Sequence, residues 1–107
     1  MISTQVLANC IEELHNITKV DLCVYDADGI EVVSTFDNEE VTGDMIRYFI
    51  ASPADSQVIG IHHLLKVLEE GELLYALVAR GSGDESYMVG KIAVSQLLQL
   101  QSAYKER

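Results

Sequence analysis

The sequence contains few basic residues and no long apolar run. Seven lysines and arginines stand against 17 acidic residues, which gives the 107-residue chain a formal net charge of -10. A surface this negative repels phosphate backbones, so we expect no direct contact with nucleic acid. No apolar run approaches the ~20 residues that cross a membrane, and the N-terminus lacks the basic segment and the cleavage site of a signal peptide. We therefore expect a cytoplasmic protein that makes no membrane contact.

Cysteines and catalytic motifs are also scarce. Cys10 and Cys23 fit no CxxC spacing and lie in apolar segments, so we expect buried thiols and neither a disulfide nor a metal site. The chain has no G-x-S-x-G and no H-E-x-x-H motif. His62 and His63 are neighbours on a predicted strand, so they project to opposite faces and cannot share a substrate or a metal ion. These absences favour a protein that is not an enzyme and carries no cofactor.

The composition is typical of one globular domain. Of the 107 residues, 49% are hydrophobic and 22% are charged, far from the composition of disordered chains. This length is near the common domain size and is sufficient to bury a sizeable core. We therefore expect residues 1–107 to form a single domain.

The longest apolar segment, residues 56–81, predicts two long strands that reverse at Glu70-Gly71. Glycine at the second position of a two-residue turn supplies the positive φ that the turn requires. In this register one face carries Ile61, His63, Leu65, Val67, Leu74, Ala76 and Val78, and the other carries His62, Leu64, Lys66, Leu68, Leu73, Tyr75 and Leu77. Both faces are mostly apolar, which is typical of strands that are covered on both sides. Helices should therefore pack above and below this hairpin.

Two shorter helices are predicted from caps and helical spacing. Ser3 or Thr4 can cap the first helix, and Thr42 can cap a second that ends at Ser52, before the only proline, Pro53. The apolar stripe of the first helix contains Leu7, Cys10, Ile11, Leu14 and Ile17. Each of these two helices is amphipathic and is expected to pack on the sheet.

A third helix is predicted from about Ser86 to the end of the chain. Ser82 and Glu85 match a capping box before the apolar run. Its stripe contains Val89, Ile92, Ala93, Leu97, Leu100 and Tyr104, and Val94 and Leu98 widen it. Because no glycine or other stop signal follows, we expect this helix to be cut at residue 107 and not finished there.

The remaining turns complete the predicted order. The segment Asp26-Ala27-Asp28-Gly29 between two β-branched runs predicts a turn and not a calcium loop, since the other acidic ligands are missing. Gly60 adds a fifth strand if it breaks the segment before His62. We therefore predict an α+β fold of order α-β-β-α-β-β-(β)-α. Its antiparallel sheet of four or five strands would have the first and last helices on one face and the second helix on the other.

A binding pocket between the second helix and its sheet face would be lined by apolar side chains with a few polar groups. The sequence leaves open which face this is, so the polar set is either His62, Lys66 and Tyr75 or His63 and Arg80. The second helix adds Arg47 and Tyr48. The candidate ligand-binding residues are therefore Arg47, Tyr48, His62, Lys66 and Tyr75. For each of them, surface solvation or a satisfied hydrogen bond in the core is the competing interpretation.

Several segments resemble the N-terminal region of bacterial regulators of the PucR type, which are akin to sugar-diacid (CdaR-like) regulators. They are residues 52–59, 63–67, 75–79, 87–93 and 103–107. The resemblance implies a PAS-like or GAF-like sensory domain that binds a small-molecule effector and precedes a C-terminal helix-turn-helix. No ligand-binding residue can be carried over from the family. The closing helix would relay the signal, and we expect a homodimer through Val94, Leu97, Leu98 and Tyr104, with the first helix as a further candidate.

The same order of elements also resembles roadblock or longin-type scaffolds, which are protein-interaction and dimerisation platforms without a small ligand. The two interpretations differ in one observable feature. A sensor should have an internal cavity on the side of the second helix. A platform should be solid there and should dimerise by extending its sheet.

Overall fold

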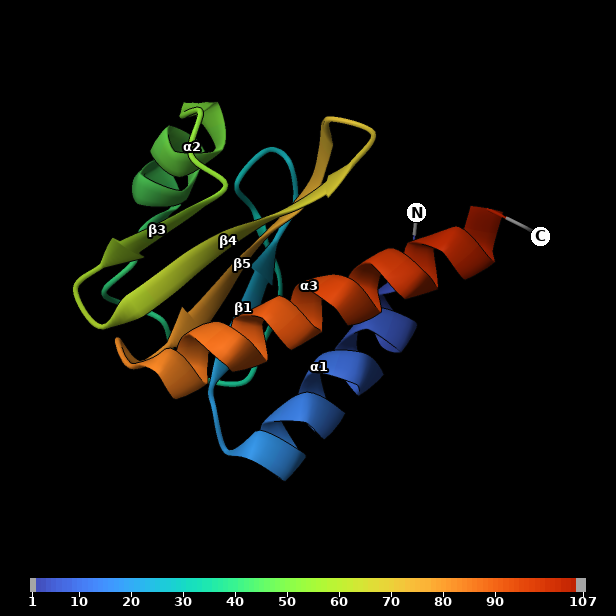
Figure 1. The fold of residues 1–107 in the computed structure, drawn as a ribbon, viewed down its shortest axis with the longest axis horizontal. Coiled ribbons are helices and arrows are strands. Elements are labelled where there is room, and N and C mark those ends of the chain that lie inside the picture. Colours follow the sequence, from blue (N-terminus) through green and yellow to red (C-terminus); the bar gives the residue numbers. More distant parts are fainter. Residues whose placement is uncertain (1, 106–107) are drawn as a thin grey trace.

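The computed structural model describes residues 2–105 and shows an α+β fold with a five-stranded antiparallel sheet. The elements are α1 (Thr4–Thr18), β1 (Leu22–Tyr25), β2 (Glu31–Ser34), α2 (Gly43–Ala51), β3 (Ser56–Ile59), β4 (His62–Glu69), β5 (Glu72–Arg80) and α3 (Asp84–Lys105). The strands lie in the order β2-β1-β5-β4-β3 (Figure 1), so β5 of the long hairpin is the central strand and β4 lies between it and the edge strand β3. The predicted fold class and element order are confirmed.

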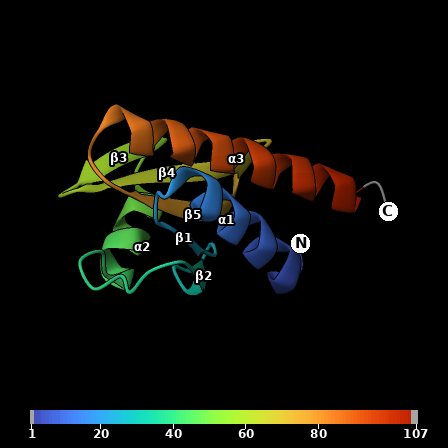
Figure 2. The ribbon, with the colours of Figure 1, turned by 90° about the horizontal axis from the view of Figure 1, so that it is seen from below.

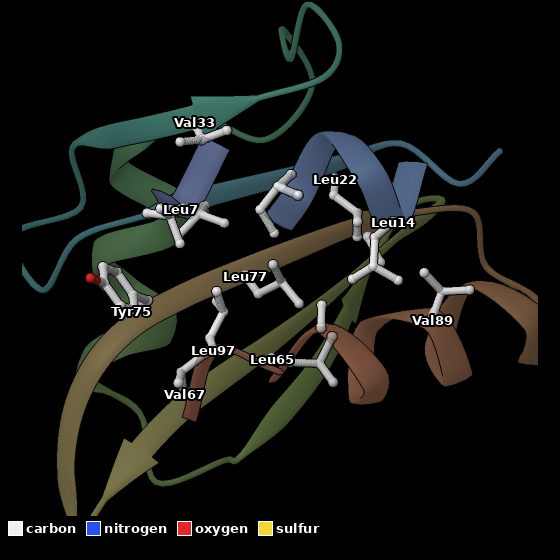
Figure 3. Close-up of a cluster of buried hydrophobic side chains, with 14 of the residues drawn as sticks. Leu7, Leu14, Leu22, Val33, Leu65, Val67, Tyr75, Leu77, Val89 and Leu97 are labelled. Carbon is white, nitrogen blue, oxygen red and sulfur yellow. The ribbon is translucent and has the colours of Figure 1, made fainter. Parts of the chain in front are cut away.

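Helices cover both faces of the sheet, as predicted. Figure 2 shows α2 on the opposite side of the sheet from α3, with α1 beside α3. The cluster under α1 and α3 includes Leu7, Leu14, Leu22, Leu65, Leu77 and Leu97 (Figure 3). The cluster under α2 comprises Cys23, Tyr25, Val41, Ile46, Phe49, Leu64, Ala76 and Val78. The central strands therefore bury side chains on both faces, which accounts for their continuous apolar sequence.

The hairpin turn is confirmed, but the predicted register is wrong beyond its first pairs. Glu70 and Gly71 both have positive φ, 51° and 83°, as a two-residue turn requires. Leu68 pairs with Leu73, but Val67 then pairs with Tyr75, so Leu74 is the extra residue of a β-bulge. The inserted residue reverses the faces of all later β5 side chains relative to β4. Ala76 and Val78 therefore lie under α2.

Local signals set the predicted turn and the helix starts. Asp26 Oδ1 accepts hydrogen bonds from the N–H groups of Asp28 and Ile30, and Gly29 has φ 79°, so this segment is a turn. Ser3 caps α1 by accepting from the N–H of Val6, and Thr42 caps α2 by accepting from that of Met45. The start of α3 differs from the prediction, because Gly83 and not Ser82 precedes its first residue.

Two residues assigned to apolar stripes face away from the core. Ile17 of α1 is 73% exposed and Ile92 of α3 is 45% exposed. Each lies at the edge of its stripe. Cys10 is only half-buried, whereas Cys23 is buried as predicted, and both are free thiols.

Helices α1 and α3 run antiparallel on one face of the sheet. The start of α1 and the end of α3 lie side by side (Figure 1), and the Tyr104 hydroxyl lies 3.4 Å from Ser3 Oγ, to which it donates. The structure describes α3 as far as Lys105, so the predicted continuation of this helix lies outside the described residues. No α-helix in residues 2–105 combines the length and apolar character that a bilayer crossing requires.

Candidate functional site

The face beneath α2, where a ligand pocket was predicted, is filled by the protein's own side chains. Phe49 and Ile46 of α2 are completely buried against Leu64 and Val78 of the sheet. The structure contains open grooves of about 480, 240 and 460 Å³, and none of the three lies between α2 and the sheet. Side chains that are buried this completely leave little room for a metabolite.

Lys66 helps to close this face. Its Nζ donates a hydrogen bond to the backbone carbonyl of Ser52, just after the end of α2. The same Nζ lies 5.2 Å from the centre of the Phe49 ring, a distance at which a cation is attracted to an aromatic face. Lys66 therefore fastens the end of α2 to β4 and does not present a free cation to a ligand.

His62 is also occupied by the protein itself. The buried His62 ring stacks on Phe36, with ring centroids 6.2 Å apart and planes inclined by 17°. Arg80 lies over the same Phe36 ring, with its Cζ 5.7 Å from the ring centre. Phe36 comes from the loop after β2, so this contact fixes the loop to the hairpin.

The remaining predicted ligand residues do not converge. Tyr75 is buried on the opposite face, in the cluster under α1 and α3, because the bulge at Leu74 reverses it. Burial raises the pKa of its hydroxyl. Arg47 is exposed and forms an ion pair with Asp44, and Tyr48 is 79% exposed on the outer surface of α2. The five candidate residues therefore do not form one site.

The alternative pair, His63 and Arg80, is likewise divided between the two faces. The His63 ring lies under the start of α3, 5.4 Å from the Tyr87 ring, with Nε2 3.3 Å from the carbonyl oxygen of Gly83. Arg80 extends over Phe36 on the α2 side. His63 therefore supports the loop before α3 and is not paired with Arg80.

A small group of polar contacts joins β1 to β2 and to the loop after β2. Cys23 Sγ lies 3.6 Å from Glu31 Oε1, and the Tyr25 hydroxyl accepts a hydrogen bond of 2.7 Å from Asn38 Nδ2. Burial raises the pKa of the Cys23 thiol to about 11, partly offset by hydrogen bonds with Tyr25 and Ser34. A thiol that stays protonated at neutral pH is a poor nucleophile. Within residues 2–105, no three His, Cys, Asp or Glu side chains are grouped to hold a metal ion.

The outer edge of β3 is the first exposed feature with recognisable binding geometry. β3 is an end strand of the sheet, and within the described chain no strand pairs with its outer side. Three of its four residues are exposed, and Val58 is 53% exposed despite being apolar. An open edge is a ready template for another strand.

The second exposed feature is the groove of about 480 Å³ between α1 and α3. It is lined by Val6, Asn9, Cys10, Glu13, Leu14, Ile17, Gln96, Gln99 and Leu100. Gln96 Oε1 accepts a hydrogen bond of 3.3 Å from Cys10 Sγ across its floor. Burial and the nearby Glu13 raise the pKa of Cys10.

The residues predicted to form a dimer contact on α3 are only partly accessible. Leu97 is completely buried in its own chain, so in this conformation it cannot contact a partner. Val94, Leu98 and Tyr104 are partly buried against the same core. Val94 and Leu98 also line the smaller groove of about 240 Å³ between α3 and the β3–β4 side of the sheet.

Sequence reasoning missed the open edge of β3 and the groove between α1 and α3. The polar Ser56 and Gln57 at the start of β3 were a weak signal for an edge strand, but the exposure of Val58 beside them depends on the strand order. The groove depends on how far apart two helices lie, which no local pattern encodes. No protein-family model and no curated protein matches this chain significantly.

Proposed function

We propose that this chain is a protein-interaction and dimerisation platform, in which β3 of one copy pairs with β3 of a second copy and extends the sheet. The observation that carries the proposal is the filled face beneath α2. A sensor of a small metabolite needs a cavity there, whereas Phe49, Lys66 and His62 occupy the space. The sheet edge next to this face is open.

The backbone of β3 supports the pairing. The N–H of Lys66 donates to the carbonyl of Asp55 at 2.9 Å, which identifies Asp55 as bonded towards β4. Because bonding direction alternates along an antiparallel strand, Gln57 and Ile59 also bond towards β4. The N–H and C=O groups of Ser56 and Val58 therefore point outwards, where a second strand would bond to them.

Exposed apolar side chains lie on the neighbouring elements. Val58 lies on β3 itself and Ile61 in the turn that follows it, and both are exposed. Met45 and Tyr48 lie three residues apart on the outer surface of α2 and are exposed as well. Aromatic residues and methionine are enriched at protein interfaces. A second copy that adds its β3 would cover part of this apolar surface.

The test removes the N–H of Val58, which points outwards from the sheet and would bond to the second copy. Val58→Pro removes an outward N–H and leaves the bonds between β3 and β4 in place, whereas the control Val58→Thr keeps both the N–H and the branched side chain. Light scattering at about 100 μM should show a wild-type dimer, an unchanged Val58→Thr dimer and a Val58→Pro dimer weakened by about tenfold or more. Circular dichroism spectra should be alike for all three. A monomeric wild type, or a Val58→Pro dimer as tight as the wild type, would contradict the proposal.

A second candidate function is the N-terminal sensory domain of a bacterial transcriptional regulator, which the resemblance to PucR-type regulators suggests. One observation favours it: α3 is 22 residues long and its last turns extend beyond the strands (Figure 1). Such a helix could transmit a change in packing to a DNA-binding domain outside this chain. A thermal-shift screen of small acids, sugars and purine metabolites tests it, since a ligand of the folded state raises the melting temperature. The absence of any shift across the screen would count against a small-molecule effector.

A further inference from the structure

The groove between α1 and α3 has apolar walls and lies on the outer surface of the molecule. The two helices run side by side (Figures 1 and 2), and Cys10 of α1 meets Gln96 of α3 across the groove. Val6, Leu14 and Leu100 contribute apolar walls to its volume of about 480 Å³. This is the largest of the three grooves, and it lies on the face of the sheet opposite α2.

Apolar side chains at the groove have no cover within the described chain. Ile17 lines it and is 73% exposed. Ile92 lies four residues before Gln96 on α3, and is therefore on the same side of the helix, and it is 45% exposed. The apolar faces of both helices thus continue past the sheet and onto the walls of the groove.

The polar groups in the groove are mostly uncharged. Asn9, Gln96 and Gln99 contribute side-chain amides, and Glu13 is the one charged residue among those that line it. That charge is negative, in a chain whose formal net charge is -10. The groove is therefore suited to an apolar surface that carries positive charge at its margin.

We infer that this groove binds an amphipathic helix of a partner protein, with an apolar stripe seated between α1 and α3 and Lys or Arg residues beside Glu13. The occupant is a helix because α1 and α3 offer no unpaired backbone groups along the groove, so an extended segment would lose its own backbone hydrogen bonds there. A third helix satisfies its backbone internally, and its side chains can fill the space between two neighbouring helices.

Charge and shape disfavour a second copy of this chain as the occupant. Two copies that met at this groove would bring two Glu13 carboxylates into one interface with no basic residue in the lining of either groove, and would place one concave surface against another. The partner helix would bind the proposed platform at a different surface from the β3 edge. A wild type that does not pair through β3 would therefore not contradict helix binding in the groove. A groove that binds no helix would not contradict pairing through β3.

The test measures binding of fluorescent peptides of about 18 residues made of leucine and lysine with leucine at helical spacing. One comparison peptide replaces lysine with glutamate, and another keeps the composition but shuffles the order to remove the stripe. In about 150 mM salt, the striped leucine-lysine peptide should bind the full chain at least about tenfold more tightly than either comparison peptide. Equal binding of the shuffled peptide would overturn the inference, because it would show general attraction to an acidic protein.

Two variants with the same change in net charge locate the binding. Gln99→Lys places a cation in the groove, and Gln57→Lys places one on β3, and both positions are exposed. Gln99→Lys should weaken binding by about tenfold and Gln57→Lys by less than about twofold. Equal effects would overturn the inference. So would a change of oligomeric state in Gln99→Lys by light scattering, because the occupant would then be a second copy.

Discussion

Replacing Gly90 with alanine should destabilise the protein, although alanine is the better helix former. Gly90 lies inside α3 at its crossing with the sheet. A Cβ built there would lie 2.8 Å from Leu65 Cδ1 and 3.5 Å from Ala79 Cβ. Carbon atoms pack best at about 3.5–4.0 Å, so the first contact is a clash. Leu65 is only 2% exposed and cannot turn into solvent to relieve it.

The size of the effect follows from two opposing terms. Alanine in a helix interior gains about 1 kcal/mol over glycine, whereas an extra methyl group in a packed core costs about 1–3 kcal/mol. With the clash near the middle of that range, the free energy of unfolding should fall by about 1 kcal/mol. For a chain of this size the melting temperature should fall by about 4 °C. Urea unfolding followed by circular dichroism measures the first quantity, and a thermal scan measures the second.

The matched control is Gly83→Ala at the start of the same helix. A Cβ at Gly83 would meet no atom within 4 Å in the described structure, and its φ is not in the left-handed region. This variant should stay within about 0.5 kcal/mol of the wild type, since the lost cap preference and the reduced freedom of the unfolded chain nearly cancel. If Gly90→Ala is as stable as the wild type or more stable, α3 does not approach Leu65 of β4 as closely as the structure shows.

Two further predictions concern buried polar groups. Because burial raises the pKa of Cys23 from 9.0 to about 11, the folded state holds its proton over a range where the unfolded state has lost it. The contribution of Cys23 to the free energy of unfolding should therefore be constant below about pH 9 and fall as the pH rises towards about 11. In urea unfolding measured across this pH range, Cys23→Ala should lose that part of the decrease. Lys66→Met keeps the apolar stem over Phe49 but loses the bond to the Ser52 carbonyl, so it should cost about 1–2 kcal/mol of unfolding free energy. An unchanged denaturation midpoint in Lys66→Met would show that this bond does not hold α2 to the sheet.

The parts of the fold that could be predicted are those that local chemistry decides. Ser3 and Thr42 cap helices because their side chains reach backbone N–H groups two or three positions on. Glu70-Gly71 forms the turn because glycine tolerates positive φ there. The two-sided apolar pattern of the hairpin correctly indicated helices on both faces.

The register could not be predicted, for a physical reason. A strand with polar residues on one side shows its facing by alternation, but β5 is apolar on both sides, so a shift of one residue leaves the pattern unchanged. The bulge at Leu74 makes such a shift, and it separates Tyr75 from His62 and Lys66. That one inserted residue removes Tyr75 from the predicted ligand set.

The candidate surfaces were hidden from sequence reasoning because they depend on neighbours. Ile17 matches the helical spacing of Leu14 as well as any core residue does, yet it is exposed, because it lies at the edge of the stripe and faces the groove between α1 and α3. Valine at position 58 is compatible with a central strand as well as with an edge strand. Only the strand order shows that its outward backbone groups face an open edge.

The adjacency of Ser3 and Tyr104 has a consequence for engineering. Since these two residues touch, a short glycine-serine linker could join the two ends of the fold, and new termini could be opened at the exposed Glu70-Gly71 turn. The resulting circular permutant would keep every strand neighbour while reversing the order in which the hairpin strands are synthesised. The same adjacency would let the whole fold be inserted into an exposed loop of another protein with little distortion of the host.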